Sequence, residues 1–319
     1  KKSINDDEYY AYRHYELLFN ENSNLSIEWE SIVQLYTKLV DWYNDNLLYH
    51  YIGFITISGI KNLSLLLIDS IGKNKEELKT DLVDLIKKEF LKVDKKDEQK
   101  PFIYYIENLN YKKYPSQTKK VLFLHNVMYY VNNMAKHKFP FELFIKEEWS
   151  IEHIIPQNPK NIEEIDVYVN WYAELLNYNE DNSYSKIVEQ LKQYDSVEAI
   201  TKDRAFKSVL DKIAEEFENT THKIDNLLLL DKNTNSALSN DLYKNKRIKI
   251  LRFDKNGKND KGEPVFIPIE TLNAFNKTFG EKINIDTWSR EDGEKYKEAI
   301  GKRLSVFLPQ SNQKNYDII

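Results

Sequence analysis

The sequence predicts a mainly α protein with a small β component, an α+β fold in which a helical N-terminal domain precedes the domain that carries the strands. Three features of the 319 residues support this prediction. Apolar residues recur at helical spacing through the first half, two short apolar runs interrupt the second half, and further helical patterns separate those runs. Helices are therefore expected to dominate.

Amphipathic segments predict three helices in the first half. Between residues 26 and 43 apolar side chains recur at i, i+3, i+4 and i+7, and Ser26 is placed to cap the segment. Residues 75–91 form a second stripe, and residues 116–132 are apolar enough to be buried. Pro140 interrupts the pattern, which predicts a helical domain over residues 1–140 and a second domain over residues 141–319.

The second domain is predicted to hold both strands. The runs at residues 149–155 and 227–230 are too short for helices and are bounded by polar or proline residues. Two or three helical patterns lie between them, over residues 162–218. A further helix is expected from Asn240 toward Ile250, and another over residues 271–279.

The composition bounds the class of protein. Hydrophobic residues at 41% beside charged residues at 30% describe an ordinary globular chain. The absence of Cys excludes disulfides, thiolate metal sites and cysteine nucleophiles, and it favours a reducing cytoplasm. No apolar run is long and unbroken enough for a membrane span. Because the first residue is Lys1 and no signal peptide follows, the chain is expected to be an excised fragment.

Charge gives two conflicting indications. The net charge of -5 does not suggest nucleic-acid binding. Between Lys232 and Lys258, however, eight basic residues stand against two acidic ones, a local balance of +6. Such a segment suits a phosphate backbone, but a solvated basic face is an equally physical interpretation.

The stretch from Trp149 to Gln157 places Glu152 and His153 side by side in an apolar strand. Neighbours on a strand point to opposite faces, so the pair can share a site only where the strand ends or bends, as Pro156 suggests. An internal His taken alone is more often a packed core residue than a catalyst.

A second stretch, from Asp225 to Lys244, opens an apolar strand with Asn226 and delivers an amide-rich loop. Asn235 follows Asn226 by nine residues, and a basic helix is expected after the loop. The alternative interpretation is an Asn-rich turn whose side chains cap their own backbone.

The two stretches together resemble the ββα-metal, or HNH, nuclease core, and more closely the C-terminal nuclease domain of GmrSD-type modification-dependent restriction enzymes. The resemblance continues through Phe266-Ile-Pro268, Trp288, Asp292 and Tyr296, and covers residues 141–308. It implies a ββα core built from residues 148–157 and 225–250 with a helical insertion between them. Residues 1–140 resemble the helical segment that precedes this nuclease domain, as a linker or assembly domain.

The resemblance implies a role for each motif residue. His153 would be the general base, since only an imidazole has an unperturbed pKa suited to deprotonating water near neutral pH. Glu152 and Asn235 would hold a divalent cation, and oxygen ligands favour Mg²⁺ or Mn²⁺. Asn226 would brace the loop and orient the imidazole. DNA-contacting roles of lower weight fall on Lys244, Asn240, Gln157, Lys246 and Arg247, and Asn240 is also expected to cap the basic helix.

The predicted function is therefore a metal-dependent DNA endonuclease that nicks one strand, since a single core has one base and one cation. Related full-length enzymes carry an NTP-hydrolysing sensor domain with an Asp-Gly-Gln-Arg type signature, which this sequence lacks. That domain and DNA are the expected partners, in an anti-phage restriction system. A homodimer, an RNA substrate and a catalytically silent DNA-binding or regulatory module remain open. His222 shows no ligand spacing, but it lies just ahead of Asn226 in the sequence and could approach the site.

Overall fold

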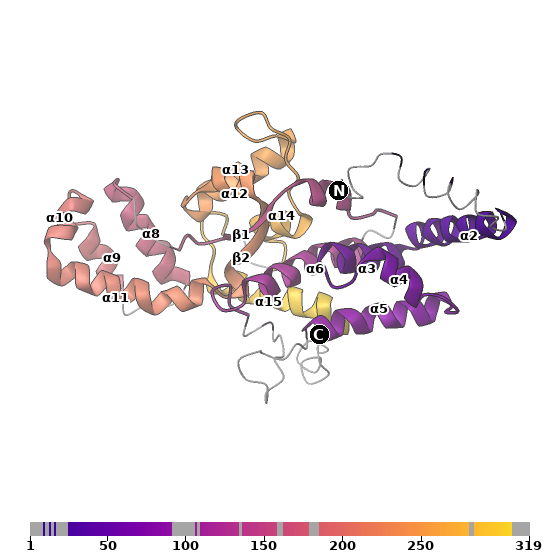
Figure 1. The fold of residues 1–319 in the computed structure, drawn as a ribbon. Coiled ribbons are helices and arrows are strands. Elements are labelled where there is room, and N and C mark those ends of the chain that lie inside the picture. The colour runs from indigo at the N-terminus through magenta and orange to yellow at the C-terminus, as the bar shows by residue number, and fades with distance from the viewer. Residues whose placement is uncertain are drawn as a thin grey trace. The chain divides into compact units, whose positions relative to one another are not determined.

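The computed structural model describes residues 25–90, 109–133, 136–157, 162–178, 185–280 and 284–307, together with Tyr9, Arg13, Glu16 and Ile106. The described residues form helices and one two-stranded sheet, and helices precede, separate and follow its two strands in the sequence (Figure 1). The prediction of a mainly α fold with a small β component is confirmed. The other residues of the two predicted domains, such as residues 308–319, lie outside the described residues. Within the described part, no helix combines the length and apolarity that crossing a membrane requires.

The chain divides into two compact units, residues 1–49 and 50–319. The first contains α2 (Leu25–Asn44), which confirms the helix expected over residues 26–43. Because α2 begins at Leu25, Ser26 lies inside its first turn rather than ahead of it. The division falls within α3 (Asn46–Ile57), so Pro140 lies inside the second unit. The assignment of separate domains on either side of Pro140 stays a prediction.

In the part of the second unit that the structure describes, four further helices follow α3 before the first strand. These are α4 (Leu63–Asp69), α5 (Lys75–Phe90), α6 (Pro115–Asn133) and α7 (Phe141–Lys146). The helices expected over residues 75–91 and 116–132 are confirmed within one residue at each end. Every side chain of α6 from Val121 to Met128 is buried, as its apolar composition predicts.

Helix α6 packs against the second strand and the last two long helices, α14 (Ile269–Asn276) and α15 (Arg290–Leu304). The Asn126 side-chain oxygen accepts a hydrogen bond from the Glu270 backbone at 3.0 Å. Thus residues from both sides of Pro140 build one core beneath the strands.

The sheet consists of β1 (Trp149–His153) and β2 (Leu227–Asp231), paired antiparallel with His153 opposite Leu227. All residues of β2 are buried, which explains its continuous run of leucines. The strand β1 ends earlier than the sequence predicts, because the backbone bends after His153 on its way to Pro156. The bend is held by a 2.9 Å hydrogen bond from the Ile154 N–H to the Asn226 carbonyl.

The amide-rich loop expected after β2 is instead a short helix, α12 (Lys232–Leu238). Asp231, the last residue of β2, caps it by accepting a hydrogen bond from the Thr234 N–H at 2.9 Å. The helix stops at Ser239, whose φ of 51° lies in the left-handed region. Asn235 therefore projects from a helix rather than from a loop.

The basic helix α13 (Tyr243–Asn256) has Leu242 at its N-cap, so the prediction that Asn240 caps it is wrong. The Glu174 carboxylate, which comes from α8 (Ile165–Tyr178), accepts a hydrogen bond from the Tyr243 N–H at 3.2 Å. A side chain from another part of the sequence therefore provides the cap. A carboxylate at this end also suits the positive pole of the helix.

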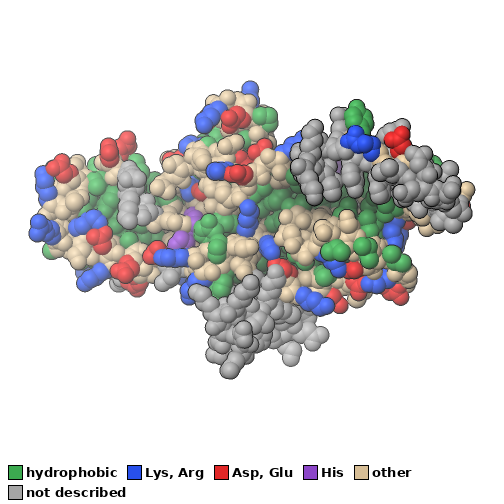
Figure 2. Space-filling view, viewed as in Figure 1, with side chains coloured by type: hydrophobic (Ala, Val, Ile, Leu, Met, Phe, Trp, Pro, Cys, Tyr) green, Lys and Arg blue, Asp and Glu red, His purple; other side chains and the backbone are tan. Residues whose placement is uncertain are grey.

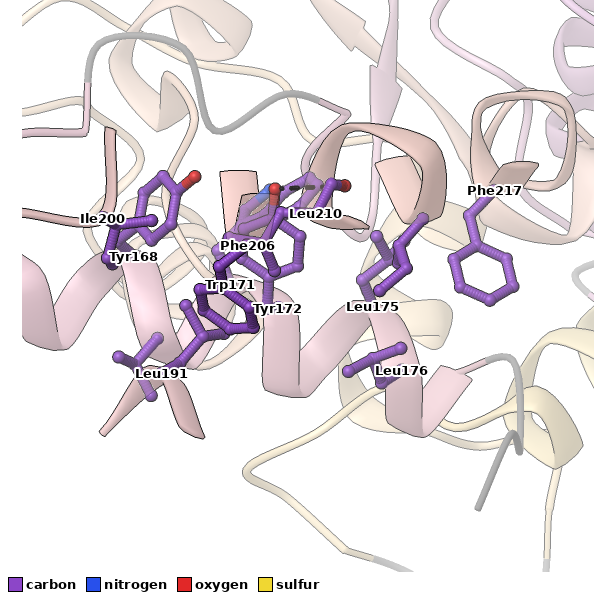
Figure 3. Packing of buried hydrophobic residues seen from close by; sticks show 12 residues of the cluster. Tyr168, Trp171, Tyr172, Leu175, Leu176, Leu191, Ile200, Phe206, Leu210 and Phe217 are labelled. Atoms are coloured by element: carbon purple, nitrogen blue, oxygen red, sulfur yellow. Dashed lines mark hydrogen bonds between the residues drawn. The ribbon is translucent and has the colours of Figure 1, made fainter. Parts of the chain in front are cut away.

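Within the described residues of the insertion between the strands there are four helices, where the sequence predicts two or three. They are α8 (Ile165–Tyr178), α9 (Ser185–Leu191), α10 (Val197–Lys202) and α11 (Arg204–Thr221). Apolar side chains along α8 and α11 meet in a separate core, shown in Figure 3, that includes Tyr168, Trp171, Tyr172, Leu175, Leu210 and Phe217. The Trp171 indole N–H donates to the Pro156 carbonyl at 3.0 Å and so ties the insertion to the turn after β1.

Candidate functional site

A cavity of about 470 Å³ opens beside the end of β1. The turn after β1, the helix α12 and the first half of α13 supply its walls. Its lining residues are Ser150, Ile151, Glu152, His153, Pro156, Gln157, Lys232, Asn235, Ser236, Ser239, Asn240 and Lys246. The two sequence motifs therefore converge on one hollow, and most of the predicted site residues share it.

Glu152 is the acidic group of this cavity, and its side chain is nearly buried. Its Oε1 lies 2.5 Å from the ammonium of Lys246, which also donates to the His153 carbonyl at 2.6 Å. Burial raises the pKa of Glu152, and Lys246 offsets this only in part. The carboxylate thus sits where further positive charge stabilises its ionised form.

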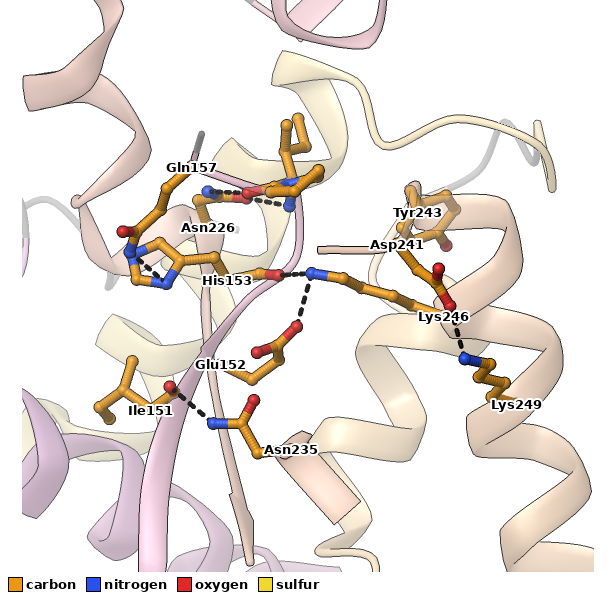
Figure 4. Close-up of polar contacts among 12 residues, drawn as sticks. Ile151, Glu152, His153, Gln157, Asn226, Asn235, Asp241, Tyr243, Lys246 and Lys249 are labelled. Atoms are coloured by element: carbon orange, nitrogen blue, oxygen red, sulfur yellow. Dashed lines mark hydrogen bonds and ion pairs between the residues drawn. The ribbon is translucent and has the colours of Figure 1, made fainter. Parts of the chain in front are cut away.

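Asn235 faces Glu152 from the helix α12. Both N–H bonds of its amide are used by β1, one to the Ser150 hydroxyl at 2.8 Å and one to the Ile151 carbonyl at 3.1 Å. With the nitrogen fixed in this way, the amide oxygen turns toward Glu152, as Figure 4 shows. Two oxygen donors from separate segments therefore face one another across the cavity.

The His153 imidazole points the other way, toward Gln157 (Figure 4). The Gln157 amide nitrogen is 2.6 Å from Nδ1 of His153 and also contacts Nε2. Burial lowers the pKa of His153 well below its usual range, and His222 and Lys246 lower it further. The ring is therefore neutral near pH 7 and able to accept a proton.

Asn226 is fully buried behind this turn. Its amide oxygen accepts from the Ile155 N–H at 2.8 Å, and its amide nitrogen donates to the carbonyls of Ile155 at 3.2 Å and Thr221 at 2.9 Å. These contacts brace the turn that follows His153, whereas the sequence led us to expect Asn226 to brace the loop after its own strand. They are made to backbone groups rather than to the imidazole.

With this geometry in place, the chain can be compared with known families. Residues 84–303, more than half of the chain, match the sequence profile of the family described as GmrSD restriction endonucleases, C-terminal domain. The chain belongs to the GmrSD family. No curated protein and no solved structure shows significant similarity to it. Membership makes the chain a nuclease module of restriction-endonuclease type with DNA as its substrate class.

Two basic residues expected to contact DNA in this GmrSD-family module lie outside the cavity. Lys244 is 3.1 Å from Asp286, and both side chains are more than half exposed. The Nε of Arg247 donates to the Phe275 carbonyl at 2.9 Å. Their contact with phosphate stays a prediction, whereas Asn240, Gln157 and Lys246 are cavity residues.

The basic stretch around α13 is largely neutralised by acidic residues, most of them from elsewhere in the chain. The face of the molecule drawn in Figure 2 accordingly shows Lys and Arg interspersed with Asp and Glu. The ion pairs are Lys232–Glu148, Lys244–Asp286, Lys246–Glu152, Lys249–Asp241 and Arg252–Asp260. The solvated-face interpretation therefore describes much of this segment.

Tyr111 and His222 lie beside His153, and Glu218 and Lys112 lie beyond His222. Of these four residues the sequence pointed only to His222. The only signal was the position of His222 shortly before Asn226. Nothing in the sequence connects Lys112 with Glu218, although their charged groups lie 2.8 Å apart.

The donor set at the cavity fits a divalent cation of the hard, oxygen-binding kind. Glu152 and Asn235 offer oxygens, and among the described residues no three His, Cys, Asp or Glu side chains gather into a closed metal cage. Such a two-oxygen site suits an ion that keeps several water ligands, as Mg²⁺ does. In this structure the Glu152 carboxylate pairs with the Lys246 ammonium.

Proposed function

We propose that this chain is an HNH-type, metal-dependent DNA endonuclease. One observation carries the proposal: the Glu152 carboxylate and the Asn235 amide oxygen, from motifs far apart in the sequence, face each other in a cavity that His153 also lines. This is the combination of base and oxygen ligands that phosphodiester hydrolysis needs. Membership of a restriction endonuclease family supports the same assignment.

The residues divide the chemistry as follows. His153 takes a proton from water, whose oxygen attacks the phosphorus as the bond to the 3′ oxygen breaks. Glu152 and Asn235 would hold the divalent cation, Mg²⁺ or Mn²⁺, which supplies Lewis-acid stabilisation of the charge on the phosphate and the leaving oxygen. Lys246 balances the charge of Glu152, and the Asn226 amide keeps the turn that carries His153 rigid.

The test is cleavage of supercoiled plasmid by the wild-type chain and by His153→Ala, with Mg²⁺ and with Mn²⁺. Nicked circles are expected from the wild type, and a rate about 10²–10⁴-fold lower from the variant, the usual contribution of a general base. His137→Ala is the matched control, because His137 is exposed. Equal cleavage by wild type and His153→Ala would remove His153 from the mechanism. Intact plasmid with both metals would favour a silent DNA-binding module instead.

The wider context of the proposal is a cytoplasmic restriction system that acts against phage. A single core has one base and one cation site, so it nicks one strand, and cutting both strands would need a second copy of the chain. Recognition of modified DNA and NTP hydrolysis would reside in a separate sensor domain, for which this chain is the nuclease partner.

A further inference from the structure

A second imidazole lies against His153. His222 follows the last turn of α11, and its Nδ1 is 3.2 Å from Nε2 of His153. The ring planes cross at 80° with centroids 5.2 Å apart, so the rings meet edge to face rather than stacked. The contact therefore joins two ring nitrogens at hydrogen-bonding distance.

The contact continues outward through charged groups. Nε2 of His222 lies 3.9 Å from the carboxylate of Glu218, one turn earlier on α11, and that carboxylate pairs with Lys112 at 2.8 Å. The backbone of His222 is anchored as well, since its carbonyl accepts the Tyr111 N–H at 2.8 Å. The Tyr111 ring lies 5.9 Å from His153 and 6.5 Å from His222, flanking both imidazoles. These contacts fix the position of the second imidazole.

The order of charged groups favours one tautomer for each ring. A neutral imidazole donates from one nitrogen and accepts at the other, and a carboxylate only accepts. Glu218 therefore favours the proton of His222 on Nε2, which leaves a lone pair on Nδ1. That lone pair accepts the Nε2–H of His153, so Nδ1 of His153 is left unprotonated.

The Gln157 amide, a cavity-lining group, contacts both nitrogens of the His153 ring, so the ring is reached from the cavity. With Nε2 engaged by His222, Nδ1 is the nitrogen left to accept a proton from a water molecule there. Proton transfer to Nδ1 breaks an O–H bond of water, forms an N–H bond and leaves hydroxide to attack the phosphorus.

We propose that His222 is the positioning residue of the general base: through its Nδ1 it holds the His153 ring in place and in the Nε2–H tautomer. The inference rests on the proposed function and adds to it a pair of residues, His222 and Glu218, that belong to the helical insertion. It predicts that the insertion takes part in the reaction through the base.

Two substitutions separate positioning from packing. In His222→Asn the amide group stands near the place of Nδ1, so contact with His153 is retained. In His222→Gln the amide reaches the place of Nε2, so contact with Glu218 is retained and contact with His153 is lost. The Asn variant is expected to keep kcat within a few-fold of the wild type, whereas the Gln variant is expected to lose about 10–100-fold in kcat at unchanged KM. His137→Gln, at an exposed position, controls for the substitution itself.

The outcomes are distinct from those that test the nuclease itself. If His153→Ala abolishes cleavage while His222→Gln cleaves like the wild type, the role of His222 is overturned and the proposed function stands. Equal losses in the Asn and Gln variants would also overturn it, because a structural role does not distinguish the two nitrogens. The ¹⁵N spectrum of histidine-labelled wild-type protein gives a readout without activity. A His153 signal of the Nε2–H tautomer is expected, and the Nδ1–H pattern would refute the assignment.

Discussion

Two buried carboxylates in this protein, Glu152 and Glu270, each pair with a cationic side chain, yet they differ in what else they meet. Glu152 lines an open cavity and faces the Asn235 amide oxygen. Glu270, in the first turn of α14, is fully buried against Arg303, with the His125 ring 3.5 Å away. Charge and burial are thus common to both.

What separates the two carboxylates is the space around them. The Glu270 group is closed by further contacts, since Asn273 donates to its carboxylate at 3.1 Å and the Arg303 guanidinium lies over the Tyr129 ring. The Glu152 group has room for water and phosphate beside it. In this protein, therefore, a buried ion pair marks a candidate reactive site where its carboxylate also borders a cavity. A buried ion pair enclosed on all sides is part of the core.

The largest loss of cleavage rate is expected from Glu152→Gln, which keeps the shape of the side chain and removes its charge. Cleavage of plasmid in Mn²⁺ should fall by about 10²-fold or more, because a charged ligand to the cation is lost. The measurement is a single-turnover rate well below the unfolding temperature. A rate within twofold of the wild type would show that Glu152 does not hold the ion.

The same substitution at the closed site, Glu270→Gln, should act on stability instead. It leaves Arg303 partly buried without its counter-charge, which is expected to cost about 3 kcal/mol in the free energy of unfolding. Urea titration measures this loss, and the rate of the protein that remains folded should be unchanged. A large loss of rate in folded protein would mean that the two carboxylates are coupled.

Acid should weaken the fold through the buried imidazoles. Burial, and then Arg303, lower the pKa of His125 well below its usual range, and burial lowers the pKa values of His153 and His222 as well. Below pH of about 6.5 the unfolded chain binds protons that the native state excludes, so the free energy of unfolding falls as pH falls, by up to about 1.4 kcal/mol per unit for each such group. Unfolding midpoints at pH 7 and pH 5 test this, and His125→Gln should lessen the difference. A flat profile would contradict it.

Lys246→Met tests how the ammonium that pairs with Glu152 affects metal binding at that carboxylate. Removing the ammonium leaves Glu152 to be neutralised by the divalent ion alone, so Mn²⁺ should bind the variant about tenfold more tightly, about 1.4 kcal/mol. The rise in unfolding temperature on adding Mn²⁺ is the readout, with Lys249→Met as the matched control on the same helix. Weaker binding to Lys246→Met would indicate that the ammonium helps to assemble the ion site.

The smallest effect is expected from Lys244→Ala. Its ion pair with Asp286 is exposed, and such pairs contribute about 0–1 kcal/mol. Cleavage should change by less than about twofold at moderate salt. A strong loss that grows as salt is lowered would instead place Lys244 on the DNA backbone.

The sequence predicted those features that depend on local pattern. Helices α5 and α6 follow from apolar periodicity, and the strands follow from short apolar runs that stop at polar or proline residues. The two motifs also led to the residues that share the cavity, because each motif contains both a strand end and polar side chains.

What could not be predicted depends on contacts between distant segments. Asn240 is not the cap of α13 because Glu174 reaches that position from the insertion, where burial raises the pKa of Glu174 to about 7. The helix α12 replaces a loop because Asp231 caps it. The basic stretch is mostly paired because acids such as Glu148 and Asp286 approach from elsewhere. No local pattern contains these pairings.

The packing of α6 bears on how small a working nuclease can be made. That helix lies before Pro140, yet it supports β2, α14 and α15, and the segment just ahead of it holds the backbone of His222 through Tyr111. A protein shortened to residues 141–319 would expose the apolar surfaces of β2, α14 and α15 that α6 covers. It would also lose the hydrogen bond from Tyr111 to His222, the residue beside the proposed base. A shortened form of this enzyme should therefore include α6 together with the strands that it supports.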